Sequence, residues 1–332
     1  MRYFPKITCV MYHYVREIKH SRFPELKGLD IKLFVEQLNY LKKYYTIISM
    51  EEAIDAIENG SKIPNNSMLL TFDDGYTDHY KYVFPILDEM KLKGSFFIPA
   101  KAILENKVLD VNKIHFILAS EDDKSKLVND IFEQLDFYRK DYNLKSNEEY
   151  FKKLAIANRY DSKEIIFIKR LLQVELQENL RKKILNYLFE KYIGMDEKSF
   201  SKELYVNSSQ IKCMYRHGMH IGSHSYDHCW LNSLSFHEQE KQVDMSLKFL
   251  KDIGIDLTNW TMCYPYSGHN KNTIEILKNK NCKLAFTSDV NFADFNVCNK
   301  HEVPRFDTND FPKDRYAPNN INKLKEVCNY KY

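Results

Sequence analysis

The sequence predicts an α/β fold in which short, largely parallel strands alternate with helices. Short β-rich runs such as residues 6–12 (KITCVMY) and 95–98 (SFFI) alternate with helical patterns through the first hundred residues, as βαβ units do. Gly and Pro number only 9 each among 332 residues, and no stretch has the composition of a flexible linker. We therefore expect a single domain over residues 1–332, built on a parallel sheet or barrel.

The first helices and strands follow from capping residues and apolar spacing. Residues 30–44 are expected to form a helix that begins at a capping Asp, and residues 45–49 (YTIIS) a short strand. Ser49 and Glu52 have the spacing of a capping box, so a second helix is expected over residues 49–58.

The next strand leads into paired acids. Residues 68–72 (MLLTF) form an apolar run that ends at Asp73 and Asp74, and a helix that contains Pro85 is expected to follow as far as Lys93. Two like charges at the end of a buried strand are unfavourable unless another group neutralises them. The paired acids therefore indicate a functional site.

The pattern changes in the middle of the chain. Residues 102–203 are long, charged and helical, with almost no strand signal, so we expect a helical insertion within the domain. Its charged faces are expected to be solvated over a small core, with a lid or a contact between copies in a homo-oligomer as the alternative.

Alternation then resumes towards the C-terminus. Helices are expected over residues 207–217 and 235–254, with a short strand at 219–222 between them. Asn272, three residues before a Glu, is expected to open a further helix, and residues 283–287 to form the strand after it.

Charge and cysteine usage exclude several classes of protein. A net charge of +3 does not favour a nucleic-acid binder. Seven scattered cysteines without a C-x-x-C pair argue against a disulfide framework or a structural zinc knuckle. The N-terminal apolar run, interrupted by His13, is too short for a signal peptide or a transmembrane segment. We therefore expect a cytoplasmic protein.

Potential metal ligands follow two of the expected strands. Asp74 comes after residues 68–72, and His224 and His228 come after residues 219–222. Active sites of α/β proteins lie at the carboxyl ends of strands. Two imidazoles and one carboxylate leave a fourth position open, as catalytic zinc sites do. A divalent cation, with Zn²⁺ as the default, would neutralise one acid and let Asp73 remain ionised as a base.

These motifs resemble a known family. TFDDG at residues 71–75, followed by HSYDH at 224–228, is similar to the first two motifs of the polysaccharide deacetylases, carbohydrate esterase family 4, or NodB-homology domains. CYPYSGHN at 263–270 resembles the third motif, usually written R-x-P-Y. The resemblance covers about residues 5–100 and 205–310. It implies a distorted (β/α)7-type barrel, with 102–203 as a large helical insertion.

The resemblance also implies a role for each matching residue. Asp73 corresponds to the catalytic base, while Asp74, His224 and His228 correspond to the metal ligands. Tyr266 corresponds to the residue whose backbone N–H helps to hold the oxyanion. The residues expected to contact substrate are Tyr76, Pro265 and Trp230, with simple packing as the alternative for Trp230.

The sequence departs from the family pattern at two places. The third motif has Cys263 where an Arg usually orients the base; Arg305 could supply that guanidinium, or could be an ordinary surface residue. The usual C-terminal L-x-H acid is absent, but VMYHYV at residues 10–15 resembles a subgroup with permuted motifs. In that subgroup a histidine at the position of His13 is the general acid, the alternative being a structural histidine.

Four further polar residues near these motifs are open to a plainer interpretation. Asp307 and Asp310 are weaker candidates for pairing with His13 or binding substrate. Asp78 and His79 could hydrogen-bond near the site, but a solvated helix start is enough to explain them.

The predicted function is a metal-dependent hydrolase that removes an N-acetyl group from an amino sugar. The expected substrate is a nucleotide-linked, lipid-linked or oligomeric precursor in bacterial surface-glycan biosynthesis. Two alternatives stay open at this stage. One is a catalytically inactive glycan-binding protein, and the other is a hydrolase of a small non-sugar amide.

Overall fold

The chain folds into two compact units. The computed structural model describes residues 5–157 and 161–329. Within the described ranges, none of the helices combines the length and apolar character that crossing a bilayer requires. All seven cysteines are free thiols. The first unit combines Met1–Arg16, Gly28–Lys107 and Ser201–Tyr332, and the second combines Glu17–Lys27 and Val108–Phe200.

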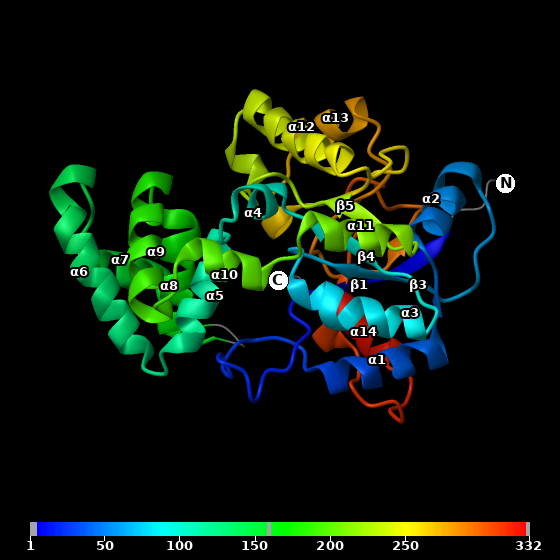
Figure 1. Cartoon of the computed structure of the whole chain (residues 1–332), viewed down its shortest axis with the longest axis horizontal. Helices are drawn as coiled ribbons and strands as arrows, with labels where there is room; N and C mark the ends of the chain where they lie inside the picture. Colours follow the sequence, from blue (N-terminus) through cyan, green and yellow to red (C-terminus); the bar gives the residue numbers. More distant parts are fainter. Residues whose placement is uncertain (1–4, 158–160, 330–332) are drawn as a thin grey trace. The chain divides into compact units, whose positions relative to one another are not determined.

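A mostly parallel sheet forms the centre of the first unit (Figure 1). Its strand order is β7-β6-β5-β4-β3-β1-β8, and of the named pairs only β1 with β8 is antiparallel. The predicted α/β class with a parallel sheet is therefore confirmed. The strands of this path are β1 (Lys6–Tyr12), β3 (Ser67–Phe72), β4 (Ser95–Ile98), β5 (His220–Ser223), β6 (Met262–Cys263), β7 (Ala285–Phe286) and β8 (Ala293–Asp294).

Two short segments complete the curl of the sheet. β2 (Thr46–Ile47) pairs with the start of β3, and β9 (Phe306–Asp307) pairs with β1. Just before β9, the Val303 N–H donates to the Ala285 carbonyl and the Val303 carbonyl accepts from the Thr287 N–H, each at 2.9 Å. The chain around residues 303–307 therefore lies between β7 and β1 and curls the sheet towards a barrel.

Side chains of the central strands alternate between two apolar clusters, because successive strand residues point to opposite faces. Val10 and Leu70 pack with Phe34 of α1, whereas Cys9 and Leu69 belong to a second cluster. That second cluster also contains Cys263 and Phe286. Continuing the alternation beyond β3 directs Asp73 towards the second cluster.

Those helices of the first unit that the sequence predicts begin and end close to the predicted positions, with two exceptions. The capping box that opens α13 joins Asn270 and Thr273, so the predicted start at Asn272 is wrong. The helix after the paired acids ends at Glu89, not Lys93, because Lys91 adopts a positive φ of 56°. These helices are α1 (Ile31–Tyr44), α2 (Met50–Asn59), α3 (Phe84–Glu89), α4 (Ala100–Glu105), α11 (Ser208–Arg216), α12 (Phe236–Asp252), α13 (Lys271–Asn279) and α14 (Ile321–Asn329).

The regular secondary structure of the second unit is helical over the residues that the structure describes. This unit is built from a run of successive helices and carries none of the named strands. The division of the chain into one domain with an insertion at 102–203 stays a prediction. The helices are α5 (Asp110–Ser120), α6 (Lys124–Tyr142), α7 (Asn147–Leu154), α8 (Lys163–Arg170) and α9 (Glu178–Ile193), while α10 (Glu197–Leu204) leads back to the first unit.

Gly222 allows β5 to pack closely on its neighbours. A Cβ atom at this position would lie 2.7 Å from the buried Phe97 ring and 2.9 Å from Thr261 Oγ1. We expect Gly222→Ala to lower the free energy of unfolding by about 1–3 kcal/mol, as overpacking does, measured by urea denaturation. The loss should be smaller in a Phe97→Leu background. Equal losses in both backgrounds would contradict the steric explanation.

Candidate active site

Three potential metal ligands converge at the carboxyl ends of β3 and β5. Asp74 Oδ1 lies 3.2 Å from both His224 Nε2 and His228 Nε2. All three side chains are buried, and their ligand atoms lie within 4.8 Å of one another. Asp74 and His228 adopt positive φ angles of 73° and 48°, a conformation that few residues other than glycine adopt. The backbone is therefore held in an uncommon conformation where it presents these ligands.

The hydrogen bonds around the trio fit a bound cation. His224 Nδ1 donates to the Cys263 carbonyl at 2.8 Å, so in the neutral ring the lone pair of Nε2 faces the carboxylate. Asp74 Oδ1 is buried and has no hydrogen-bond partner among the described residues. Lone pairs facing one another at 3.2 Å repel unless a proton or a cation lies between them. Ligands of a tetrahedral zinc ion with bonds of about 2.0–2.1 Å have a similar spacing. The residues thus fit a divalent metal.

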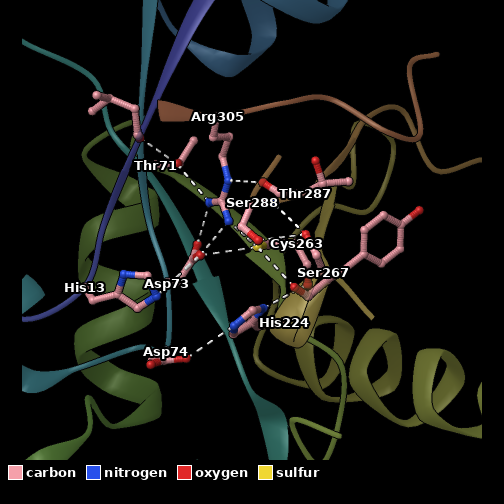
Figure 2. Close-up of polar contacts among 12 residues, drawn as sticks. His13, Thr71, Asp73, Asp74, His224, Cys263, Ser267, Thr287, Ser288 and Arg305 are labelled. Carbon is pink, nitrogen blue, oxygen red and sulfur yellow. Dashed lines mark hydrogen bonds and ion pairs between the residues drawn. The ribbon is translucent and has the colours of Figure 1, made fainter. Parts of the chain in front are cut away.

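Asp73 forms a buried ion pair with Arg305 (Figure 2). Nη1 donates to Asp73 Oδ1 at 2.9 Å, and Nη2 donates to Oδ2 at 2.7 Å. Arg305 is only 2% exposed and also donates to Thr71 Oγ1 and the Thr287 carbonyl, so the alternative of a surface arginine is wrong. Burial by itself would raise the pKa of Asp73, but the Arg305 guanidinium outweighs it and holds that pKa well below its usual range.

Cys263 stands beside this ion pair. Its Sγ lies 2.9 Å from Arg305 Nη2 and 3.3 Å from Asp73 Oδ2. Burial raises the pKa of the Cys263 thiol, which therefore stays protonated. Asp73, His224 and Cys263 form a second cluster of possible ligand atoms, but the guanidinium already contacts two of them. The third motif has a cysteine in place of its usual arginine. Arg305, which directly precedes β9, contacts the Asp73 carboxylate instead.

His13 extends from the end of β1 towards the same carboxylate (Figure 2). Its Nε2 lies 4.0 Å from Asp73 Oδ2, and its side chain is 40% exposed. His13 is thus both close to the buried acid and accessible from outside. A general acid needs both properties.

The residues expected to contact substrate lie in two places. Tyr266, which follows Pro265, has φ 56° and stacks on Trp230 with ring centroids 4.7 Å apart. Its ring also meets His228 edge-on at 4.8 Å. Tyr76, in contrast, is fully buried and donates its hydroxyl hydrogen to Asp74 Oδ2. That bond orients a metal ligand, while the contact of Tyr76 with substrate stays a prediction.

One sequence interpretation of nearby polar residues needs correction, and another stays a prediction. The carboxylates of Asp307 and Asp310 cap their own turn, because they accept from the Asn309 and Asp307 N–H groups respectively. Asp78 and His79 are 3% and 0% exposed, so the expected solvated helix start is wrong. The run of polar letters in YTDHYK hid this burial, which depends on contacts with residues 13–16.

The chain is similar to known deacetylases. A sequence model of the family described as "Polysaccharide deacetylase" matches residues 60–133 and 175–285, more than half of the chain. The Bacillus subtilis (strain 168) protein YxkH, whose name places it with the same family, is 29% identical over 99 residues. That match covers 30% of this chain and a third (33%) of the length of YxkH.

Solved structures share the fold. The Streptococcus pyogenes deacetylase PplD in complex with acetate gives a TM-score of 0.57 at 16% identity and covers 92% of each chain. IcaB from Ammonifex degensii gives 0.56 at 17% identity and covers 99% of each chain. The de-N-acetylase from Aggregatibacter actinomycetemcomitans gives 0.54 at 15% identity and covers 97% of this chain and 99% of its own. The expected barrel of the NodB-homology kind is confirmed; the permuted subgroup stays a prediction.

Removal of a ligand should abolish metal binding. We expect His228→Ala to weaken Zn²⁺ affinity by about 100-fold or more, since losing even an outer partner of a ligand costs about 10–100-fold. Tyr76→Phe, which removes the hydroxyl that donates to Asp74, should fall within that smaller range. Affinity would be measured by competition with a chromogenic chelator. The exposed His237 on α12 supplies the control His237→Ala, and an equal loss there would contradict the assignment.

Removal of Arg305 should destabilise the fold, because it leaves the buried Asp73 carboxylate without its ion-pair partner. We expect Arg305→Met to lower the free energy of unfolding by about 3–5 kcal/mol, as breaking a buried pair does, in urea denaturation with chelator present. Asp73→Asn should recover part of that loss in the Arg305→Met background. The control is Arg315→Met, which breaks a more exposed pair with Glu36 and should have a much smaller effect. Strictly additive losses of the Asp73 and Arg305 variants would contradict the pairing.

Proposed function

The chain belongs to the polysaccharide deacetylase family, and on this premise we propose that it hydrolyses the N-acetyl group of an amino sugar with a divalent cation as cofactor. One observation carries the proposal. A carboxylate held by a guanidinium, Asp73, adjoins an Asp-His-His cluster whose spacing and facing ligand atoms suit a bound cation. An amide hydrolase needs both parts, a base for the water and an electrophile for the carbonyl.

In the proposed reaction, Asp73 accepts a proton from the water that attacks the acetyl carbonyl. Arg305 holds both oxygens of that carboxylate, so the base is ionised and fixed in orientation. A carboxylate with a lowered pKa is a weak base. A divalent ion on Asp74, His224 and His228 would supply the missing activation, because it acidifies water and polarises a carbonyl.

The remaining steps, oxyanion stabilisation and protonation of the leaving amine, use Tyr266 and His13. The Tyr266 backbone N–H would donate to the oxyanion of the tetrahedral intermediate. His13 would protonate the amine nitrogen as the C–N bond breaks, which releases acetate and the free amino sugar. The 4.0 Å between His13 Nε2 and Asp73 Oδ2 supports a path by which the proton taken from water returns to the leaving group.

The cofactor and the substrate follow from the same groups. Two imidazoles and one carboxylate suit Zn²⁺ better than the harder cations, so we propose zinc. The relatives include a deacetylase solved with acetate and a de-N-acetylase, which supports an acetyl group on nitrogen as the scissile bond. Trp230 stacked on Tyr266 offers an apolar face beside the ligand His228, as a sugar ring requires.

An acetate-release screen tests this function. The protein would be stripped with chelator, reloaded with Zn²⁺, and assayed against UDP-N-acetylglucosamine, a polyprenyl-linked N-acetylglucosamine and penta-N-acetylchitopentaose. We expect zinc-dependent release of acetate from at least one of them. Zinc binding with sugar affinity but no acetate from any substrate would refute the proposal and indicate a binding protein. Release only from small non-sugar amides would also refute it.

The base assignment has its own test. Asp73→Asn keeps the size of the side chain and removes the proton acceptor, so turnover should fall by about 100-fold or more. Zinc content should stay at the level of the unsubstituted protein, because Asp73 is not among the Asp74 ligand trio. A near-normal rate for this variant would show that another group is the base.

A further inference from the structure

The backbone carbonyl groups of residues 12, 13 and 14, on either side of and at His13, each accept a hydrogen bond from another part of the chain. The parallel ladder between β1 and β3 ends at the pair Tyr12 and Phe72. Beyond it, the Tyr12 carbonyl accepts from the Asp73 N–H at 3.0 Å, and the Tyr14 carbonyl accepts from the Leu29 N–H at 2.9 Å. The His13 carbonyl between them is bonded instead by a side chain.

That side chain belongs to His79, whose Nε2 lies 2.9 Å from the His13 carbonyl oxygen. A carbonyl can only accept, so Nε2 must carry the proton. His79 is fully buried against the rings of Phe72, Tyr76 and Phe96, with centroids 5.5–5.6 Å away. Burial lowers the pKa of His79 to about 4, which keeps the ring neutral at ordinary pH.

The burial of His79 has an energetic cost. Its Nδ1 has no hydrogen-bond partner among the described residues, and a buried polar atom without a partner is destabilising. A leucine or phenylalanine would fill the same apolar surroundings without that cost. The bond to His13 is therefore the contact that distinguishes histidine from an apolar residue here.

Asp78, the residue before His79, attaches the same segment a second time. The Arg16 guanidinium donates to it through Nε and Nη2, at 2.7 and 2.8 Å. Asp78 is 3% exposed, so this is a desolvated, two-bond contact. One residue after His13, the ring of Tyr14 stacks on Tyr76 at 4.1 Å. Three contacts, made by His13, Tyr14 and Arg16, thus join this segment to the turn that follows the paired acids.

We propose that His79, with the Arg16–Asp78 pair as a second attachment, is a positioning residue that fixes the backbone of His13 so that its imidazole faces Asp73. The side chain of His13 is 40% exposed and its position depends largely on where the backbone places it. Small displacements of a reacting group are costly in rate. This inference rests on the proposed function, in which His13 protonates the leaving amine.

Comparing two substrates distinguishes a loss of His13 positioning from a general loss of active-site structure. Acetate release from penta-N-acetylchitopentaose needs a proton on the departing amine, whereas 4-nitrophenyl acetate has a leaving group that departs without one. We expect His79→Leu to lower kcat about tenfold or more on the amide, with KM unchanged. Hydrolysis of the ester should stay within about twofold. His79→Gln, whose amide N–H can reach the same carbonyl, should restore most of the amide rate.

A double-substitution cycle identifies the route of the effect. If His79 acts through His13, His79→Leu should cause no further loss of amide activity in a His13→Ala background. The same loss in both backgrounds, or a normal rate for His79→Leu, would overturn the inference. A normal amide rate for His13→Ala alone would instead overturn the role of His13 in the proposed function, so the two failures are distinguishable.

A matched control is available in His301. It is 2% exposed, its Nε2 bonds the Cys282 carbonyl at 3.0 Å, and its Nδ1 also has no partner among the described residues. His301→Leu should lower stability without changing the ratio of amide to ester rates. If His79→Leu does not fold, Asp78→Asn takes its place in the cycle. If Asp78→Asn lowers the amide rate only when His13 is present, positioning is supported. If Asp78→Asn leaves the ratio of amide to ester rates unchanged, the inference is overturned.

Discussion

The buried ion pair between Asp73 and Arg305 is the interaction on which the rest of the site depends. An ionised carboxylate inside a protein needs a partner that is both charged and well oriented, and the guanidinium meets both of its oxygens. The same guanidinium is held by Thr71 on β3 and by the Thr287 carbonyl. The pair therefore joins the centre of the sheet to the chain around residues 303–307.

The two adjacent carboxylates of the DDG motif point in different directions, because the backbone turns between them. Asp73 continues the alternation of β3 and points to the interior, where a permanent cation balances it. Asp74 turns away at φ 73° and meets His224 and His228, where the proposed divalent cation would balance it. Adjacent like charges are tolerable when each faces its own counter-charge, which for Asp73 is the Arg305 guanidinium.

Much of this arrangement follows from local sequence. The paired acids, the two histidines four residues apart and the capping boxes of α2 and α12 are short-range patterns, and the structure has them where the sequence predicts them. The pairing of Asp73 with Arg305 is not a local pattern. Arg305 is 232 residues away in the sequence and becomes a neighbour of Asp73 only when the sheet curls. The burial of Asp78 and His79 is hard to predict for the same reason, because polar residues next to a turn indicate solvent exposure unless distant residues cover them. Burial of this kind is tertiary, and no local pattern encodes it.

The late position of Arg305 in the chain also bears on biosynthesis. Translation delivers Thr71, Asp73 and their strand long before the residues at 303–307 leave the ribosome. A nascent chain stopped short of that point would carry a carboxylate in its interior with no counter-ion, together with an open edge beside β1 where β9 belongs. Residues 303–307 therefore complete the sheet and the ion pair of the first unit, and a nascent chain released before they are made would be expected to aggregate or be degraded.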